Sequence, residues 1–364
     1  MTRGDDLSQD LDTNQQNKNS NKLQTYKPMS QYESFIYNQQ PVILNSSLSQ
    51  LRYLILSQGL PTGKNNNRLR IHVWSVLLQC SMENCTSQYL ALLSKGEDLP
   101  PLIFNKIKND TPRTLVKDST FQKTVPEDAL LRGLCCFAWE SIDIAATAAA
   151  AGIVEGNEDT HLSSFANSSG IHEDDREVLA EENIYKISEY VQGMNVLLAP
   201  LLFVCESSEP MAFRFFTKIC RRYIPTYLNK NLSGVYKGAQ LLEICLSIID
   251  PKLSKFLRQD HLLTAEIYGI PSIMTLSACT PPLNEVLKLW DFMFAYGVHM
   301  NILFMVAQLV LMRSELLKSP TPMNLLKNFP QFNADEVIRL GVGFIAKLPH
   351  NVYQSLVEHL YRIT

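Results

Sequence analysis

The sequence predicts an all-α protein: one multi-helix domain with a disordered polar tail before it and a disordered polar insertion inside it. Apolar side chains recur every three or four residues along most of the chain, which is the period of an amphipathic helix. Runs that alternate apolar and polar residues between turn residues are scarce, so no strand is predicted. No repeat of fixed period occurs, which disfavours a solenoid.

Composition narrows the class of protein. With 364 residues and 46% hydrophobic residues, the chain is long and apolar enough to bury a sizeable core. A net charge of −3 argues against a polyanion binder, so no nucleic-acid partner is expected. The most apolar stretches, residues 196–205 and 302–312, are too short to span a bilayer. They predict buried helices, and no transmembrane segment is expected.

The domain limits follow from polar stretches. Residues 1–30 are rich in Asn, Gln, Ser, Asp and Lys, which predicts a disordered tail. A helical domain is predicted over residues 50–364. At about 145–182 it is interrupted by a stretch that begins with an alanine-rich run, which could extend the preceding helix. The rest has too little apolar surface to offset its ordering entropy, so a flexible surface insertion is predicted.

Within the domain, four apolar faces at helical spacing predict core helices. They are formed by Leu69, Val73, Trp74, Leu77 and Leu78; by Leu130, Leu134 and Phe137; by Met211, Phe215 and Ile219; and by Leu283, Leu287, Trp290 and Phe294. Because Trp74, Trp139 and Trp290 lie on apolar helix faces, all three are expected in the core. Prolines such as Pro200, Pro225 and Pro251 are expected to mark element boundaries.

The sequence contains no motif for catalysis or metal binding by this protein itself. Pro61-Thr62-Gly63-Lys64 lacks the first glycine and the Ser or Thr of a phosphate loop. The seven histidines are scattered, and the eight cysteines contain no Cys-x-x-Cys pair and lie mostly in apolar runs. Reduced, buried thiols in a cytoplasmic protein are therefore predicted, with no metal, cofactor or nucleophile.

Two short polar segments stand out among apolar surroundings. The first runs from Asp110 to Thr114 and contains Pro112-Arg113; alone, it is best interpreted as a helix cap followed by a surface arginine. The second runs from Tyr190 to Asn195 and leads into a very apolar helix. Alone, its Gln192-Gly193 step is best interpreted as a turn that caps a core helix.

Together the two segments resemble the two signature motifs of TBC domains, all-helical GTPase-activating proteins that act mostly on Rab-type GTPases. The resemblance rests on Ile107-x-x-Asp110-x-x-Arg113-Thr114 and on Tyr190-x-Gln192-Gly193-Met194-Asn195. Two flanking segments agree with that family. Residues 69–78 resemble its opening Arg-x-x-Val-Trp helix, and residues 277–297 resemble its later Pro-Leu…Trp-Asp…Gly helix. The resemblance covers roughly residues 55–320 in the family's order.

Within that family, the chain resembles most the fungal TBC subunit of a two-component activator that restrains mitotic exit in the spindle-position checkpoint. This narrower resemblance rests on residues 132–140 and on Ser188-Glu189-Tyr190. It implies a second activator subunit or scaffold as a partner. It also implies recruitment to the spindle pole body.

The resemblance implies roles for seven residues. Arg113 would be an arginine finger inserted in trans into a small Ras- or Rab-like GTPase, with Asp110 orienting its guanidinium. Gln192 would be a second finger that positions the attacking water. The supporting residues would be Asp110, Thr114, Tyr190, Gly193 and Asn195. GTP and Mg²⁺ would belong to the GTPase, so the chain would be an activator rather than an enzyme.

Three alternatives stay open at this level. Glu189 stands where many family members have glycine, so the water could instead be positioned by the GTPase's own glutamine. The chain could be an autonomous Rab activator of vesicle traffic rather than a mitotic-exit subunit. It could also be a non-catalytic TBC adaptor, against which the presence of both finger residues counts.

Overall fold

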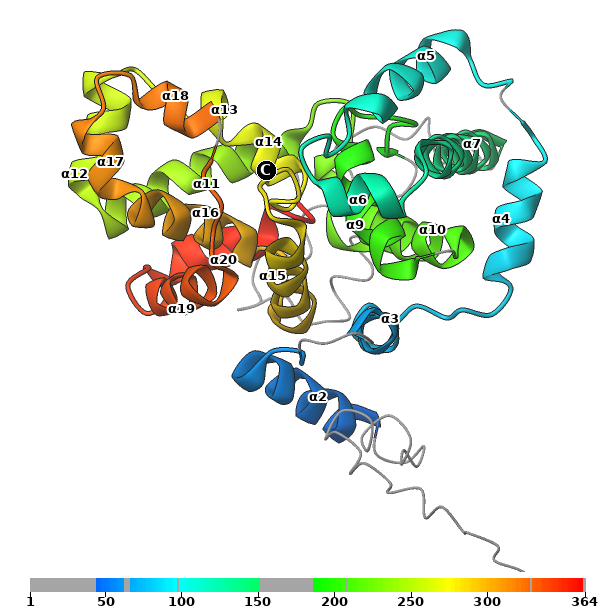
Figure 1. Ribbon diagram of the computed structural model, residues 1–364, viewed down its shortest axis with the longest axis horizontal. Helices are drawn as coiled ribbons and strands as arrows, with labels where there is room; N and C mark the ends of the chain where they lie inside the picture. Colours follow the sequence, from blue (N-terminus) through cyan, green and yellow to red (C-terminus); the bar gives the residue numbers. More distant parts are fainter. Residues whose placement is uncertain are drawn as a thin grey trace, which may run out of the picture. The chain divides into compact units, whose positions relative to one another are not determined.

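The computed structural model describes residues 44–61, 66–96, 98–150, 186–206, 208–327 and 329–362, and their regular structure is helical. Within these ranges the one β feature is an isolated antiparallel bridge between Ile187 and Asn229, which confirms the all-α prediction. The elements in chain order (Figure 1) are α2 (Leu44–Gln58), α3 (Asn66–Leu77), α4 (Cys85–Leu93), α5 (Pro101–Asp110), η2 (Thr111–Arg113), α6 (Ser119–Thr124), α7 (Glu127–Ala150), α9 (Met194–Cys205), α10 (Glu209–Lys218), η4 (Ile219–Tyr223), η5 (Pro225–Tyr227), α11 (Ser233–Ile249), α12 (Pro251–Lys255), η6 (Phe256–Asp260), α13 (Ala265–Tyr268), α14 (Ile270–Met274), α15 (Leu283–Tyr296), α16 (Met300–Leu311), α17 (Arg313–Lys318), α18 (Pro322–Lys327), α19 (Ala334–Ile345) and α20 (His350–Glu358).

Two helices that are apolar on all sides organise the core. The first, α9, packs against α3, α7 and α10, and the second, α16, packs against α11, α15 and α19 (Figure 1). Nearly every side chain of both helices is buried, as expected for a helix without a polar face. The prediction of buried helices at 196–205 and 302–312 is confirmed. In the described part of the chain, no helix is both long enough and apolar enough to cross a membrane.

The tryptophans divide between core and surface. Trp74 and Trp290 have no exposed surface, and the Trp74 ring centroid lies 5.0 Å from that of Phe294. The core prediction is wrong for Trp139, which is half-buried and whose indole N–H donates to the Gly96 carbonyl at 3.0 Å. Trp139 lines a cavity of about 320 Å³ between α4 and α7, so its ring is not enclosed by side chains on every side.

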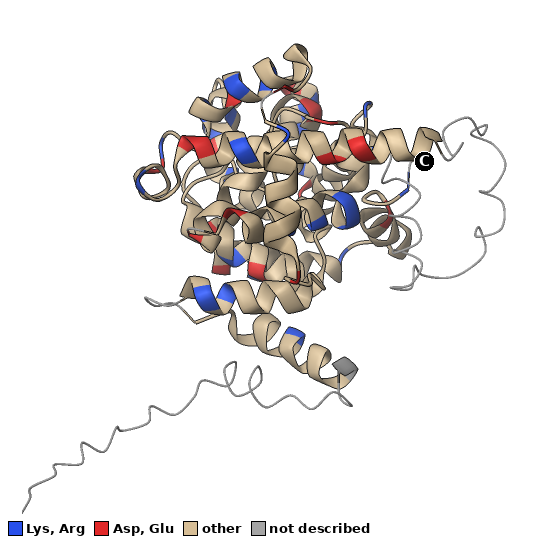
Figure 2. Cartoon of the chain, turned by 90° about the vertical axis from the view of Figure 1, so that its right-hand side faces the viewer, with Lys and Arg blue, Asp and Glu red and all other residues tan. Residues whose placement is uncertain are grey.

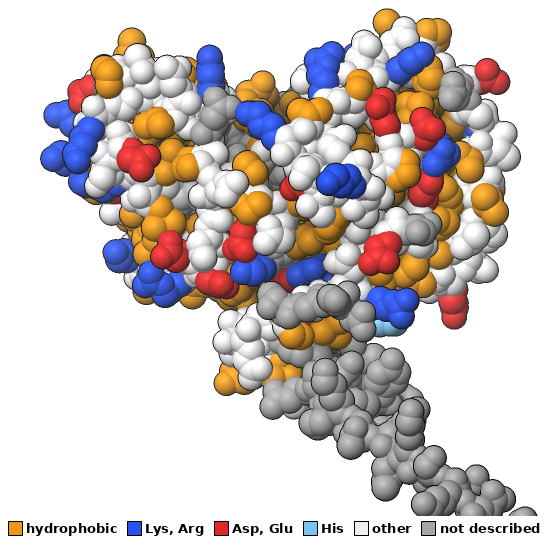
Figure 3. Space-filling model, in the orientation of Figure 1, with side chains coloured by type: hydrophobic (Ala, Val, Ile, Leu, Met, Phe, Trp, Pro, Cys, Tyr) orange, Lys and Arg blue, Asp and Glu red, His pale blue; other side chains and the backbone are white. Residues whose placement is uncertain are grey.

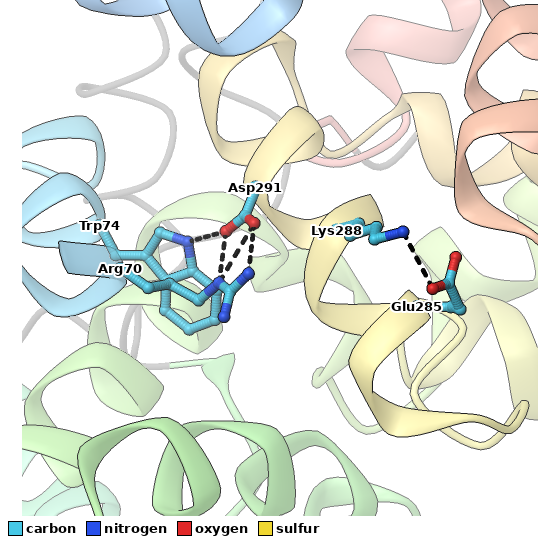
Figure 4. A network of polar contacts seen from close by, with 5 residues as sticks. All are labelled: Arg70, Trp74, Glu285, Lys288 and Asp291. Carbon is cyan, nitrogen blue, oxygen red and sulfur yellow. Dashed lines mark hydrogen bonds and ion pairs between the residues drawn. The ribbon is translucent and has the colours of Figure 1, made fainter. Parts of the chain in front are cut away.

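A buried ion pair joins α3 to α15. The Arg70 guanidinium donates to both carboxylate oxygens of Asp291 at 2.8–3.1 Å, and the Trp74 indole N–H donates to the same carboxylate at 2.8 Å (Figure 4). The side chains of Arg70 and Asp291 are 7% and 4% exposed. Because both side chains are buried and Arg70 lies outside the two signature motifs, the pair serves to hold α3 against α15.

Other local predictions are wrong or lie outside the described residues. Pro200 was expected at a boundary but lies inside α9, where packing on all sides offsets the missing N–H donor. Two adjacent arginines such as Arg221-Arg222 usually mark a solvated helix end rather than a phosphate site, but Arg221 is buried and donates to Glu140 at 3.1–3.2 Å. The predicted tail lies outside the described residues. So does the predicted insertion from residue 151 onward, while residues 145–150 continue α7.

His359 is a buried histidine whose tautomer is set by its neighbours. Its Nδ1 lies 2.6 Å from the Leu356 carbonyl oxygen, and because a carbonyl only accepts, Nδ1 carries the proton. Nε2 therefore accepts from the Tyr227 hydroxyl at 2.8 Å. Burial lowers the pKa of His359 to about 4, because the charged imidazolium would lose its hydration.

This depressed pKa predicts a loss of stability in mild acid. As pH falls from about 6.5 towards about 4, the unfolded chain takes up a proton at residue 359 that the folded chain does not bind. The free energy of unfolding should fall by up to about 1.4 kcal/mol per pH unit from this residue alone. Urea unfolding across this range should therefore give a steeper pH dependence for the wild type than for His359→Gln. Equal slopes would contradict the assignment.

Candidate functional site

Arg113 lies at the end of a tightened helix terminus. The Thr111 hydroxyl donates to the Ile107 carbonyl at 2.7 Å, and Ile107 is buried. Pro112 has no N–H to continue the ladder of α5, so the chain tightens into η2 and turns extended at Thr114. The Arg113 side chain is exposed and forms no hydrogen bond or ion pair with any residue that the structure describes. Its guanidinium is therefore available to a ligand.

Gln192 lies two residues before α9, a helix that is apolar on all sides. Gly193 takes φ of +106° as the residue before α9, a left-handed conformation that turns the chain into the helix. Gln192 is exposed, and no hydrogen bond joins its amide to the described residues. Like Arg113, Gln192 has an exposed polar side chain next to buried residues of its own motif.

The two motifs are joined by hydrogen bonds between their supporting residues. The Tyr190 hydroxyl donates to Asp110 Oδ2 at 2.9 Å. The Asn195 amide donates to Thr114 Oγ1 at 2.8 Å and to the Asp110 carbonyl at 3.2 Å. Tyr190, Asn195 and Thr114 are buried, so these bonds are shielded from water.

This network holds the backbone on either side of the two exposed side chains, Arg113 and Gln192. Burial, with the adjacent Asp110 carboxylate, raises the pKa of Tyr190, so the phenol keeps its proton and donates. Four of the five supporting residues predicted from the sequence thus meet in one cluster. The fifth, Gly193, provides the turn beside it.

The predicted contact between Asp110 and Arg113 is not formed. Among the described residues, Asp110 uses its carboxylate to accept from Tyr190, and no bond joins it to the guanidinium. The reason is geometric: η2 turns Arg113 to the surface, whereas Asp110 faces the second motif. In this structure Asp110 fixes the backbone that carries Arg113 rather than orienting its guanidinium.

Gln122, which belongs to neither motif, also supports the backbone of this site. The Gln122 side chain donates to the Thr114 carbonyl at 2.9 Å and so holds the backbone just after Arg113. Gln122 is placed there by α6, whose start is capped by Asp118 Oδ1 accepting from the Thr120 and Phe121 amides at 3.1 and 2.9 Å. Asp118 before Ser-Thr is a readable helix start. No sequence pattern predicts the contact between Gln122 of α6 and Thr114.

Gly193 should be intolerant of a side chain. A Cβ there would lie 3.1 Å from Met274 Cγ, and φ of +106° is strained for any other residue. Gly193→Ala should lower the free energy of unfolding by about 1–3 kcal/mol. Gly343→Ala is a matched control, because its Cβ would meet nothing within 4 Å. In urea unfolding, a Gly193→Ala variant as stable as Gly343→Ala would contradict this account.

The exposed guanidinium of Arg113 gives the site its chemical character. An exposed guanidinium can donate two parallel hydrogen bonds to phosphate or carboxylate oxygens. The described residues include no group of three side chains that could hold a metal ion. Burial raises the pKa of thiols such as Cys136, to about 12, which disfavours the nucleophilic thiolate.

Comparisons with known proteins identify the family that this chain resembles. Residues 158–317 match the Rab-GTPase-TBC domain family, a range that includes Gln192 and begins after Arg113. Mitotic check point protein BUB2 of Saccharomyces cerevisiae is 54% identical over 336 residues, which cover 91% of this chain and 97% of the relative. Cell division control protein 16 of Schizosaccharomyces pombe is 35% identical over 315 residues, which cover 86% of this chain and 88% of the relative.

A solved structure resembles this chain in fold. The Ypt/Rab-GAP domain of GYP1P superposes with a TM-score of 0.59 and covers 85% of this chain and 93% of that chain. The two sequences are 15% identical, so the likeness concerns the arrangement of helices alone.

Proposed function

The chain belongs to the Rab-GTPase-TBC domain family, and from this premise we propose that it accelerates GTP hydrolysis by a small Ras- or Rab-like GTPase and thereby restrains mitotic exit. Arg113 acts in trans as an arginine finger. The observation that carries this proposal concerns Arg113, whose side chain is exposed and has no partner among the described residues. The backbone that carries it is tied by hydrogen bonds to the second motif. The chain is an activator, and GTP and Mg²⁺ belong to the GTPase.

The chemistry of GTP hydrolysis fits this arrangement. A Ras-like GTPase is slow because charge on the transferring phosphoryl group is under-stabilised and the attacking water is poorly held. Arg113 supplies a planar, permanent charge with two parallel donors for the phosphate oxygens. Holding its backbone through Asp110 and Thr114 lowers the entropy lost when the finger inserts.

The mitotic role is supported by how far the relatives extend. The similarity to the two cell-division proteins covers most of this chain and most of each relative. The mouse TBC1 domain family member 10B, at 30% identity, aligns with 38% of this chain and 17% of its own length. We therefore favour a mitotic-exit activator with a second subunit, acting in the cytoplasm and at the spindle pole body, over an autonomous activator of vesicle traffic.

Single-turnover hydrolysis tests the proposal. The probes are the Ras- and Rab-type GTPases of Saccharomyces cerevisiae, each loaded with GTP. The chain is assayed alone and as the complex that co-purifies when it is expressed with a tag in yeast. We expect acceleration of a mitotic-exit GTPase that is strongest with the complex. Full activity of the chain alone on a vesicle-traffic Rab would favour the autonomous activator, and no acceleration in either form would favour the adaptor.

Gln192 is expected to contribute less than Arg113. If its amide positions the attacking water, Gln192→Ala should lower kcat of the stimulated reaction by about 10²-fold, the usual cost of one aimed donor. Replacing the catalytic glutamine of the GTPase by leucine should then have little effect on stimulated hydrolysis. Gln259→Ala, an exposed amide on η6, is the control. The opposite pattern would assign water positioning to the GTPase.

A further inference from the structure

The segment that carries Arg113 forms a basic edge, defined as residues 101–124 of α5, η2 and α6. It holds five positive and two negative side chains, a net charge of +3, whereas the whole chain has a net charge of −3. Lys and Arg side chains are visible over α5 and α6 (Figure 3). The five basic side chains are exposed and form no ion pair with a described residue: Lys106, Lys108, Arg113, Lys117 and Lys123.

Both carboxylates of the basic edge are already engaged. Asp110 accepts from Tyr190, and Asp118 accepts from two amides of α6. Both carboxylates keep their negative charge in these hydrogen bonds, but the five cations outnumber them, so the field outside this edge is positive. The next helix along the chain, α7, has the opposite charge in its first turn, which contains Glu127 and Asp128. Acidic and basic positions alternate over the cartoon in Figure 2.

The same segment also exposes apolar side chains. Leu102 and Val116 are 79% and 59% exposed, among the highest values for large apolar side chains in the described residues. Val116 follows Leu115, whose φ of +45° is a strained conformation for leucine. Exposed apolar side chains within a charged surround are typical of a surface that binds another protein.

We propose that the basic edge docks the partner GTPase and binds an acidic part of its surface next to the nucleotide. This inference rests on the proposed function, because Arg113 lies in the middle of the edge. Val116 is three residues from Arg113, at most about 11 Å along the backbone. A partner whose phosphates receive the Arg113 guanidinium therefore also meets the residues around Val116. The lysines raise the rate of encounter, whereas Arg113 acts on the bound nucleotide.

The test separates encounter from chemistry. Stimulated GTP hydrolysis is measured with the GTPase and the form of the chain, alone or in complex, found active above, from about 50 to about 300 mM KCl. The variant Lys106→Glu/Lys108→Glu is compared with Lys252→Glu/Lys255→Glu on α12, whose lysines are also exposed. We expect the first variant to lower kcat/KM about tenfold at low salt, with unchanged kcat and a weaker salt dependence. The α12 control should match the wild type, with circular dichroism confirming that both variants fold.

The other outcomes distinguish failure of the docking edge from failure of the proposed function. Unchanged kcat/KM and salt dependence in Lys106→Glu/Lys108→Glu, with hydrolysis still requiring Arg113, would overturn the docking edge and leave the proposed function standing. If that variant instead loses binding only to vesicles of anionic lipid, the edge binds membranes and the inference is overturned. No acceleration by the wild type in any form would overturn the proposed function and this inference with it.

Discussion

Replacing Arg113 by alanine should lower kcat of the stimulated GTPase reaction by about 10³-fold or more, while KM changes by only a few fold. The reason is that the guanidinium acts mainly on charge that develops in the transition state, and an arginine supplied in trans contributes on the order of 10³ to 10⁵ in rate. The folded chain should keep its stability, because the Arg113 side chain is exposed and has no partner among the described residues. Single-turnover hydrolysis at saturating activator measures the effect.

Arg113→Lys distinguishes a finger from a general positive charge. Lysine keeps the charge but lacks the planar pair of donors, so its kcat should lie near that of the alanine variant. Arg68→Ala is the matched control, since Arg68 is an exposed arginine on α3 outside both motifs. If Arg113→Ala stimulates hydrolysis like Arg68→Ala, the chain is an adaptor and the finger assignment is wrong.

Removing the Asp291 carboxylate should have the largest effect on stability. Asp291 accepts from Arg70 and from Trp74 in a buried cluster that joins α15 to α3. Asp291→Ala leaves the Arg70 guanidinium buried without its counter-charge, which costs about 3–5 kcal/mol. Urea unfolding of the variant should show a loss of that size in the free energy of unfolding.

Two further variants make the stability prediction specific. Arg70→Met/Asp291→Leu removes both charges and should recover much of the loss, because the desolvation cost disappears with the pair. Lys288, on the same helix, forms an ion pair with Glu285 (Figure 4). Its Nζ lies 3.0 Å from Glu285 Oε1, and this pair is more exposed than the pair of Arg70 and Asp291. Lys288→Ala should therefore lower the free energy of unfolding by at most about 1 kcal/mol. Asp291→Ala behaving like Lys288→Ala would show that the buried pair adds little.

The fold was predictable where local pattern decides it. Helical periodicity anticipated α3, α10 and α15, and unbroken apolar runs anticipated the buried α9 and α16. The failures have a common cause in tertiary packing. Pro200 lies inside a helix because surrounding side chains hold it, and Trp139 reaches the surface because its side of α7 lines a cavity. Neither arrangement can be predicted from the residues next to Pro200 or Trp139 in the sequence.

The two motifs of the candidate site can be found in the sequence, but the contacts between them cannot. Arg113 and Gln192 emerge from the order of motifs along the chain, and both prove to be exposed. The bond between Tyr190 and Asp110 spans 80 residues, and the one between Asn195 and Thr114 spans 81. Pairings at such separations depend on the whole fold. This is why Asp110 was expected to contact Arg113 and instead contacts Tyr190.

Formation of a transition-state complex tests the central claim most directly. The GTPase, loaded with GDP, is mixed with the activator in the presence and absence of aluminium fluoride, which mimics the transferring phosphoryl group, and complex formation is measured by size-exclusion chromatography. If Arg113 stabilises the charge of the transition state, the wild type should form a stable complex only with fluoride, and Arg113→Ala and Arg113→Lys should form none. A fluoride-dependent complex of Arg113→Ala as stable as that of the wild type would contradict the claim.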